Sequence, residues 1–190
     1  EALWQRVRPG ASETLASVPR THHVLVLDAS LSMTAKAADG DGTRFQRALA
    51  QAEALVRAGG PGDGYTVLAL TGRGAQPVVP GPSNDPDKVV AEIRKVKPTH
   101  GPADHAAALA SVADLLPRSP RAYPRRQLTV FTDLQKASWA NAAPRADTST
   151  AELWQRVAAR ADVAVVDCAA RDADNLAVAD VELADRMPLV

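Results

Sequence analysis

Aromatic residues are scarce in this chain, and its charges cancel. Of 190 residues only 4% are aromatic, and 22 Lys and Arg residues balance 22 Asp and Glu residues. Nucleic-acid-binding proteins usually have a basic excess or stripe, together with aromatic side chains on which bases stack. We therefore expect no nucleic acid among the partners of this protein.

The chain also has no second cysteine and no long apolar run. Cys168 cannot form an intramolecular disulfide, and its place after the apolar stretch 163–166 predicts a buried, unreactive thiol. No stretch reaches the roughly 20 apolar residues of a transmembrane helix, and the first residues of the chain do not have the pattern of a signal peptide. The chain begins at Glu1 rather than Met and ends at Val190 without a stop signal for its last strand. We expect a soluble piece of a longer protein.

Strand and helix patterns alternate along the sequence. Apolar runs at 23–28, 65–70, 127–132 and 163–167 predict buried strands, and a short proline-flanked stretch at 76–79 predicts an edge strand. Amphipathic helices are predicted between them, starting near Thr43, Asp85, Gly101 and Ser149. The alternation indicates an α/β fold: a doubly wound, mostly parallel sheet flanked by helices on both faces.

The helix starts have recognisable caps. Thr43 with Gln46, and Ser149 with Glu152, have the spacing of capping boxes. Pro86 follows Asp85 at the first helical position, where a missing N–H costs nothing. These signals fix the start of three of the four predicted helices.

The first strand leads into the segment Asp28-Ala29-Ser30-Leu31-Ser32. One carboxylate and two hydroxyls therefore follow the C-terminal end of a buried strand, where open α/β sheets bind ligands. Such oxygen donors suit Mg²⁺, which usually keeps several waters and takes one or two protein carboxylates. The alternative is an ordinary strand-to-helix turn, in which Asp and Ser bond to the backbone.

A second buried strand, 128–132, also ends on an aspartate, Asp133. Parallel strands end at one edge of the sheet, so Asp28 and Asp133 are expected to converge. Two carboxylates brought together would repel each other and raise one pKa, and a divalent ion would remove that conflict.

At this point the sequence resembles the von Willebrand factor A family over residues 21–170. The family's metal-ion-dependent adhesion site combines Asp-x-Ser-x-Ser, a downstream Thr and a later Thr-Asp. The resemblance implies that Asp28, Ser30, Ser32 and Asp133 hold Mg²⁺ or Mn²⁺, with Ca²⁺ as a further candidate. It also implies a protein partner that presents an acidic side chain to the ion, with no catalytic residue.

The chain departs from the family pattern at two positions. Counting back from Leu109 places Ala103, which cannot coordinate, where the family has threonine. Asp104 is the expected replacement ligand, or else a helix cap, and Thr99 is another candidate donor. Leu134 stands where the family commonly has glycine.

Finer likenesses point to a subgroup of the family. Thr43-Arg44-Phe45, Pro98-Thr99-His100-Gly101 and Thr132-Asp133-Leu134-Gln135 resemble the bacterial Bat-type proteins associated with aerotolerance. Those proteins carry transmembrane helices before the A domain. The likeness implies a full-length protein anchored in a membrane through segments outside this chain, with the domain on the extracytoplasmic side favoured.

We therefore expect a connector over 1–20, an A-type domain over 21–170, and a final strand or the start of another domain over 171–190. The expected function is protein binding through a divalent cation. The alternatives are a metal-free A domain that acts as an assembly scaffold, and a metal-dependent hydrolase. The hydrolase lacks support because no nucleophile elbow, Asp-x-Asp pair or P-loop is present. Zinc is disfavoured because only His100 and His105 flank the site loop.

Overall fold

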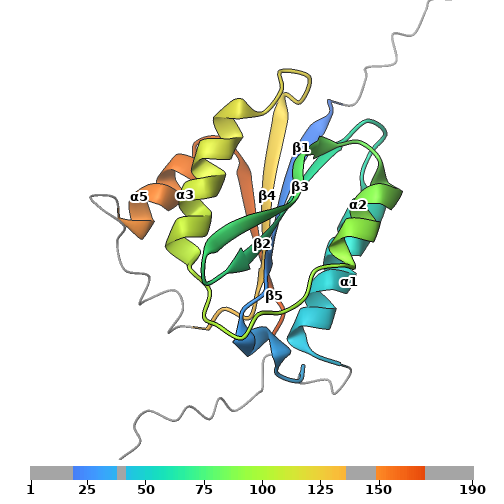
Figure 1. Ribbon diagram of the computed structural model, residues 1–190. Coiled ribbons are helices and arrows are strands. Elements are labelled where there is room, and N and C mark those ends of the chain that lie inside the picture. The colour runs from blue at the N-terminus through green and yellow to red at the C-terminus, as the bar shows by residue number, and fades with distance from the viewer. Residues whose placement is uncertain (1–18, 38–41, 136–148, 170–190) are drawn as a thin grey trace, which may run out of the picture.

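β1 (Thr21–Asp28) is the central strand of a five-stranded sheet in the computed structural model, which describes residues 19–37, 42–135 and 149–169. The strand order is β3-β2-β1-β4-β5 (Figure 1). β1 pairs in parallel with β2 and β4, β4 pairs in parallel with β5, and only β3 is antiparallel. The other strands are β2 (Gly64–Thr71), β3 (Gly74–Ser83), β4 (Arg125–Thr132) and β5 (Asp162–Asp167).

Helices cover both faces of the sheet, as Figure 1 shows. α1 (Arg44–Ala58) and α2 (Pro86–Ile93) lie on one face, and α3 (His105–Leu115) and α5 (Thr150–Ala158) lie on the other. Two short 3₁₀ helices, η1 (Leu31–Thr34) and η2 (Leu116–Arg118), follow β1 and α3. The predicted doubly wound α/β fold is confirmed.

β1 is apolar throughout because both its faces are buried. Leu25 and Leu27 belong to the core under α1 and α2, whereas Val24 and Val26 belong to the core under α3 and α5. Because each face of β1 packs against a hydrophobic core, its sequence does not alternate between apolar and polar residues as a half-exposed strand does. Its apolar run therefore marks the middle of the sheet.

The predicted caps are present. The Thr43 hydroxyl accepts a hydrogen bond from the Gln46 backbone N–H, and the Gln46 side chain accepts one from the Thr43 N–H. Ser149 and Glu152 form the same reciprocal pair before α5. Asp85 caps α2, with Pro86 in its first turn. Each cap satisfies helix N–H groups that have no partner inside the helix.

β3 is longer than the predicted strand at 76–79, since it runs from Gly74 to Ser83. It includes Pro77, Pro80 and Pro82, which an edge strand tolerates because its outer N–H groups need no partner. The final strand or following domain expected over 171–190 lies outside the described residues, as does the expected connector over 1–20 except for its last two residues. Over the described part of the chain, no helix has both the length and the apolarity needed to cross a membrane.

Candidate functional site

The candidate site lies where β1 and β4 end. The two strands are parallel neighbours, with Leu27 opposite Phe131. Asp28 closes β1, and Asp133 directly follows β4, so both carboxylates lie at the same edge of the sheet, as predicted. Both residues are buried. The site is therefore a buried polar cluster beneath the loops rather than an open acidic surface.

Asp28 has donors on both carboxylate oxygens. Oδ1 accepts a hydrogen bond from the Ser30 backbone N–H at 2.9 Å, and Oδ2 accepts one from the Thr132 hydroxyl at 2.8 Å. The ring Nε2 of His105, the first residue of α3, lies 3.6 Å from Oδ2. Burial raises the pKa of Asp28, but the hydrogen bonds from His105, Ser30 and Thr132 outweigh it and leave the pKa below its ordinary value. Asp28 is therefore held as a carboxylate.

Ser30 and Ser32 lie at the start of η1, and their hydroxyl oxygens are 3.1 Å apart. Ser30 is buried, and Ser32 is half-buried. Neighbouring ligands of an octahedral Mg²⁺ with bonds of about 2.1 Å are separated by about 3 Å. The two hydroxyls therefore have the separation that two adjacent positions around one cation require.

Asp133 already has a cationic partner. Its Oδ2 accepts a hydrogen bond from Nη1 of Arg44 at 2.9 Å, and the two side chains are 2% and 6% exposed. The expected repulsion between Asp28 and Asp133 therefore does not require a metal ion, which corrects the electrostatic argument made from the sequence. Each carboxylate is satisfied by donors of the protein itself.

Asp104 caps α3. Its Oδ1 accepts a hydrogen bond from the Ala107 backbone N–H at 2.9 Å. The hydroxyl of Thr99, the other candidate ligand, donates a hydrogen bond to the Ala29 carbonyl at 2.8 Å. The cap interpretation of Asp104 is thus observed, and its role as a metal ligand stays a prediction.

Leu134 follows the site in a left-handed backbone conformation, with φ of +52°. This conformation is unfavourable for a residue with a Cβ and favours glycine. The position at which the sequence departs from the family's glycine therefore keeps the backbone shape that glycine would adopt. Leu134 is 45% exposed, and Leu31, between the two serines, is 50% exposed.

His100 and His105, the two histidines that flank the site loop, have different surroundings. His105 is buried beside Asp28, whereas His100 is exposed on the preceding loop. Within the described ranges, no group of three or more His, Cys, Asp or Glu residues is placed to hold a metal ion. Cys168 is buried in the core, and burial together with the charge of Asp167 raises the pKa of its thiol to about 12. The predicted burial of the thiol is confirmed, and its low reactivity stays a prediction.

Sequence reasoning missed Arg44, and it considered His105, which flanks the site loop, only as a candidate zinc ligand. A signal for Arg44 was present: it lies four and eight residues before Ala48 and Ala52, on the buried stripe of α1. An arginine on a buried stripe, at the start of a helix whose dipole disfavours a cation, requires an acidic partner. The contact of His105 with Asp28 had no comparable local signal.

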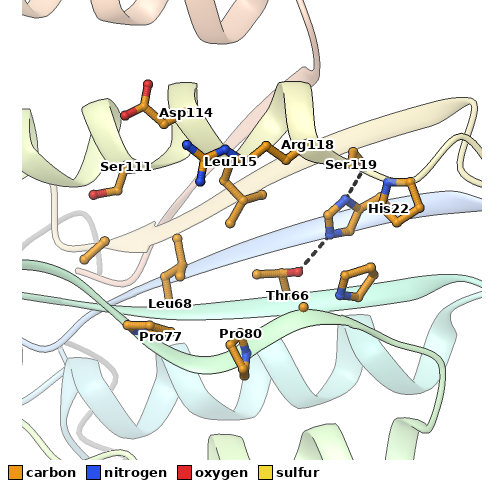
Figure 2. Close-up of a pocket in the computed structure, with 14 residues that line it drawn as sticks. His22, Thr66, Leu68, Pro77, Pro80, Ser111, Asp114, Leu115, Arg118 and Ser119 are labelled. Atoms are coloured by element: carbon orange, nitrogen blue, oxygen red, sulfur yellow. Dashed lines mark hydrogen bonds between the residues drawn. The ribbon is translucent and has the colours of Figure 1, made fainter.

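A separate cavity of about 340 Å³ lies at the other end of the sheet, between β3 and the end of α3 (Figure 2). His22, at the N-terminal end of β1, lines it. The His22 ring nitrogens contact the Ser119 hydroxyl at 2.5 Å and the Thr66 hydroxyl at 2.8 Å. Burial and the charges of His23 and Arg126 lower the pKa of His22 to about 4, so the ring is neutral at pH 7. His22 and His23 lie at the N-terminal end of β1, away from the candidate site.

This chain folds as a doubly wound domain, with helices on both faces of its sheet. Its candidate site is the polar cluster at the C-terminal ends of β1 and β4. The model of the von Willebrand factor type A domain matches residues 23–135. The chain belongs to this family.

Solved structures share the fold. An aerotolerance-related membrane protein from Bacteroides fragilis is 20% identical, with a TM-score of 0.55 over 77% of this chain and 66% of that one. BatB from Bacteroides thetaiotaomicron is 18% identical, with a TM-score of 0.56 over 76% of this chain and 65% of that one. The chain thus spans slightly less than two thirds of either protein. The comparison with curated proteins gave no match.

Proposed function

We propose that this chain is a protein-binding domain that uses a divalent cation at the C-terminal edge of its sheet. Ser30 and Ser32 would hold the ion together with Asp28, and a partner protein would supply an acidic side chain. The observation that carries this proposal is the 3.1 Å separation of the two serine hydroxyls beside an ionised, buried carboxylate.

The donor set suits a hard cation. Hydroxyl and carboxylate oxygens are the ligands that Mg²⁺ and Mn²⁺ take in proteins. The hydroxyls of Ser30 and Ser32 bond to each other, an arrangement in which each oxygen keeps a lone pair for an ion. When bound, the ion would supply positive charge that attracts a carboxylate from a partner. Asp133 and Asp104 remain proposed ligands, although each has a protein partner in this structure.

The first test is a calorimetric titration of the chain with Mn²⁺. We expect saturable binding at one site, lost in the double variant Ser30→Ala, Ser32→Ala. Thr34→Ala is a matched control, since Thr34 lies in the same 3₁₀ turn and its hydroxyl donates to the Leu31 carbonyl. The loss of binding in Thr34→Ala as well would mean that the turn, rather than the hydroxyl pair, governs the result.

The second candidate function is an assembly scaffold that needs no metal. The ion pair between Arg44 and Asp133, the capping role of Asp104 and the presence of Ala103 favour it. Partner capture that is unaffected by EDTA and by the double serine variant would support the scaffold and contradict the cation-bridged function.

We also propose that the domain has no hydrolytic activity and belongs to a membrane-anchored protein. Doubly wound domains that bind through loops at the strand ends need no general base, and family membership favours binding over catalysis. One similar structure is an aerotolerance-related membrane protein, which supports the location. Metal-dependent turnover of phosphate or carboxylate esters that disappears in Asp28→Asn would overturn the proposed lack of hydrolytic activity.

A further inference from the structure

We propose that Arg44 is an internal cation that competes with the divalent ion for Asp133 and so sets the metal affinity of the site. The inference rests on the proposed function, because it concerns the same site. It adds a regulating residue that lies outside the motif of oxygen donors. In this scheme the domain has two arrangements, with Asp133 bound either to the guanidinium or to the metal ion.

The position of Arg44 makes this competition strong. It is the first residue of α1, and its backbone N–H donates to the Ala35 carbonyl at 2.9 Å, which fixes the start of the helix against the loop after β1. Its side chain is 6% exposed. A buried guanidinium is screened little by water, so its attraction for Asp133 is stronger than that of a surface arginine.

The ion pair also changes the charge that a metal would meet. Asp28 and Asp133 together contribute two negative charges, and Arg44 offsets one of them. A divalent ion therefore enters a cluster of weaker negative charge than the carboxylates alone would make. Because Oδ2 of Asp133 already accepts a hydrogen bond from Arg44, this oxygen must be shared or released before it can bind the ion.

Arg44 is poorly satisfied apart from this bond. Among the described residues, its buried Nε has no hydrogen-bond partner. The guanidinium thus depends on Asp133 for its principal polar contact, and losing Asp133 to a metal would carry a cost for Arg44. This cost is the physical basis of the competition.

The test compares Mn²⁺ binding by the wild-type chain and by Arg44→Gln, using calorimetry and the EPR signal of free Mn²⁺. We expect the variant to bind Mn²⁺ at least about tenfold more tightly, since each factor of ten needs only a small change in binding energy. We also expect Mn²⁺ to raise the melting temperature of Arg44→Gln more than that of the wild type, because the ion would replace the lost partner of Asp133.

Arg57→Gln is the matched control. Arg57 lies on the same helix, and its ion pair with Asp87 is exposed, with an Nη1–Oδ1 distance of 3.5 Å. The substitution changes the net charge equally but leaves the site untouched, so Mn²⁺ affinity should stay at the wild-type value. Arg44→Lys covers the case in which Arg44→Gln does not fold, and it should give an affinity between the two, since an ammonium pairs with a carboxylate less completely.

The outcomes separate the two proposals. In one outcome, the wild type binds Mn²⁺ while both Arg44 variants bind it with equal or weaker affinity than the wild type. This result would overturn the role of Arg44 and leave the cation site standing. Equal tightening in Arg57→Gln would reduce the effect to net charge and would also overturn it. Absence of Mn²⁺ binding in the wild type and in every Arg44 variant would overturn the cation site, and the role of Arg44 with it.

Discussion

The two ends of β1 both hold buried polar side chains, but they use them differently. At the N-terminal end, the His22 ring is neutral and lies between two hydroxyls, and Asp63 bonds to backbone N–H groups of Thr21 and Gly60. At the C-terminal end, two carboxylates meet an arginine, a histidine and hydroxyls that β1, β4 and their loops supply.

The difference lies in what remains available to a ligand. At the N-terminal end, the hydroxyls of Ser119 and Thr66 both contact the neutral His22 ring, and the Asp63 carboxylate accepts from backbone N–H groups. At the C-terminal end, the hydroxyls of Ser30 and Ser32 bond to each other, next to the Asp28 carboxylate. The burial of polar groups alone therefore does not mark a binding site. A cation site also needs hydroxyl oxygens that can still accept an ion, next to a side chain that keeps its charge.

The largest expected effect comes from removing the carboxylate at the C-terminal end. Asp28→Ala should lower the free energy of unfolding by about 4 kcal/mol, because it leaves several buried donors without their acceptor. Asp28→Asn, which keeps one oxygen acceptor, should cost less. Urea denaturation measures both, and equal small losses would mean that the cluster contributes little to the fold.

A titration probes the N-terminal end. The folded-state pKa of His22 is about 4, against 6.5 in the unfolded chain, so the unfolded state binds more protons between these values. Stability from this group is therefore complete above pH 6.5 and falls by about 3 kcal/mol as the pH drops to 4. Urea denaturation across this range should show the slope in the wild type and a smaller one in His22→Gln. If stability falls equally with pH in the wild type and in His22→Gln, a group other than His22 is responsible for the pH dependence.

A smaller effect is expected at Leu134. Leu134→Gly should raise the free energy of unfolding by about 0.5 to 1 kcal/mol, since glycine adopts the left-handed conformation freely but loses more chain entropy on folding. Leu134→Ala, which keeps a Cβ, is the control and should not stabilise. Thermal denaturation distinguishes the two. Stabilisation by alanine would show that the exposed side chain, rather than the backbone, carries the cost.

The smallest effect is expected at Cys168, whose backbone N–H donates to the Thr132 carbonyl beside the candidate site. With a pKa of about 12, the buried thiol should show no reaction with a thiol reagent at pH 8 while the chain is folded. Labelling in urea provides the reference. Rapid labelling of the native chain would reveal that the C-terminal end opens more readily than the N-terminal end.

The sequence predicted the fold well because its signals are local. Apolar runs marked the parallel strands, and capping boxes marked α1 and α5 within a residue. The edge strand β3 was underestimated, since its prolines interrupt the strand pattern while its antiparallel pairing to β2 continues. Pairing across strands is a tertiary property that local propensity does not report.

The site was predicted in part for the same reason. Asp28, Ser30, Ser32 and Asp133 could be placed at one edge, because each follows a strand whose direction was known. Arg44 and His105, which contact the carboxylates, are the first residues of α1 and α3, and their side-chain directions depend on how those helices pack. No spacing in the sequence encodes that packing, although the buried stripe of α1 included Arg44.

The prolines of β3 have a consequence for how copies of this domain meet in solution. An outer strand normally offers a row of N–H and C=O groups that a neighbouring chain can extend into a continuous intermolecular sheet. Pro77, Pro80 and Pro82 each lack the N–H that such growth needs. β3 is therefore a poor template for the strand-by-strand addition that builds fibrils.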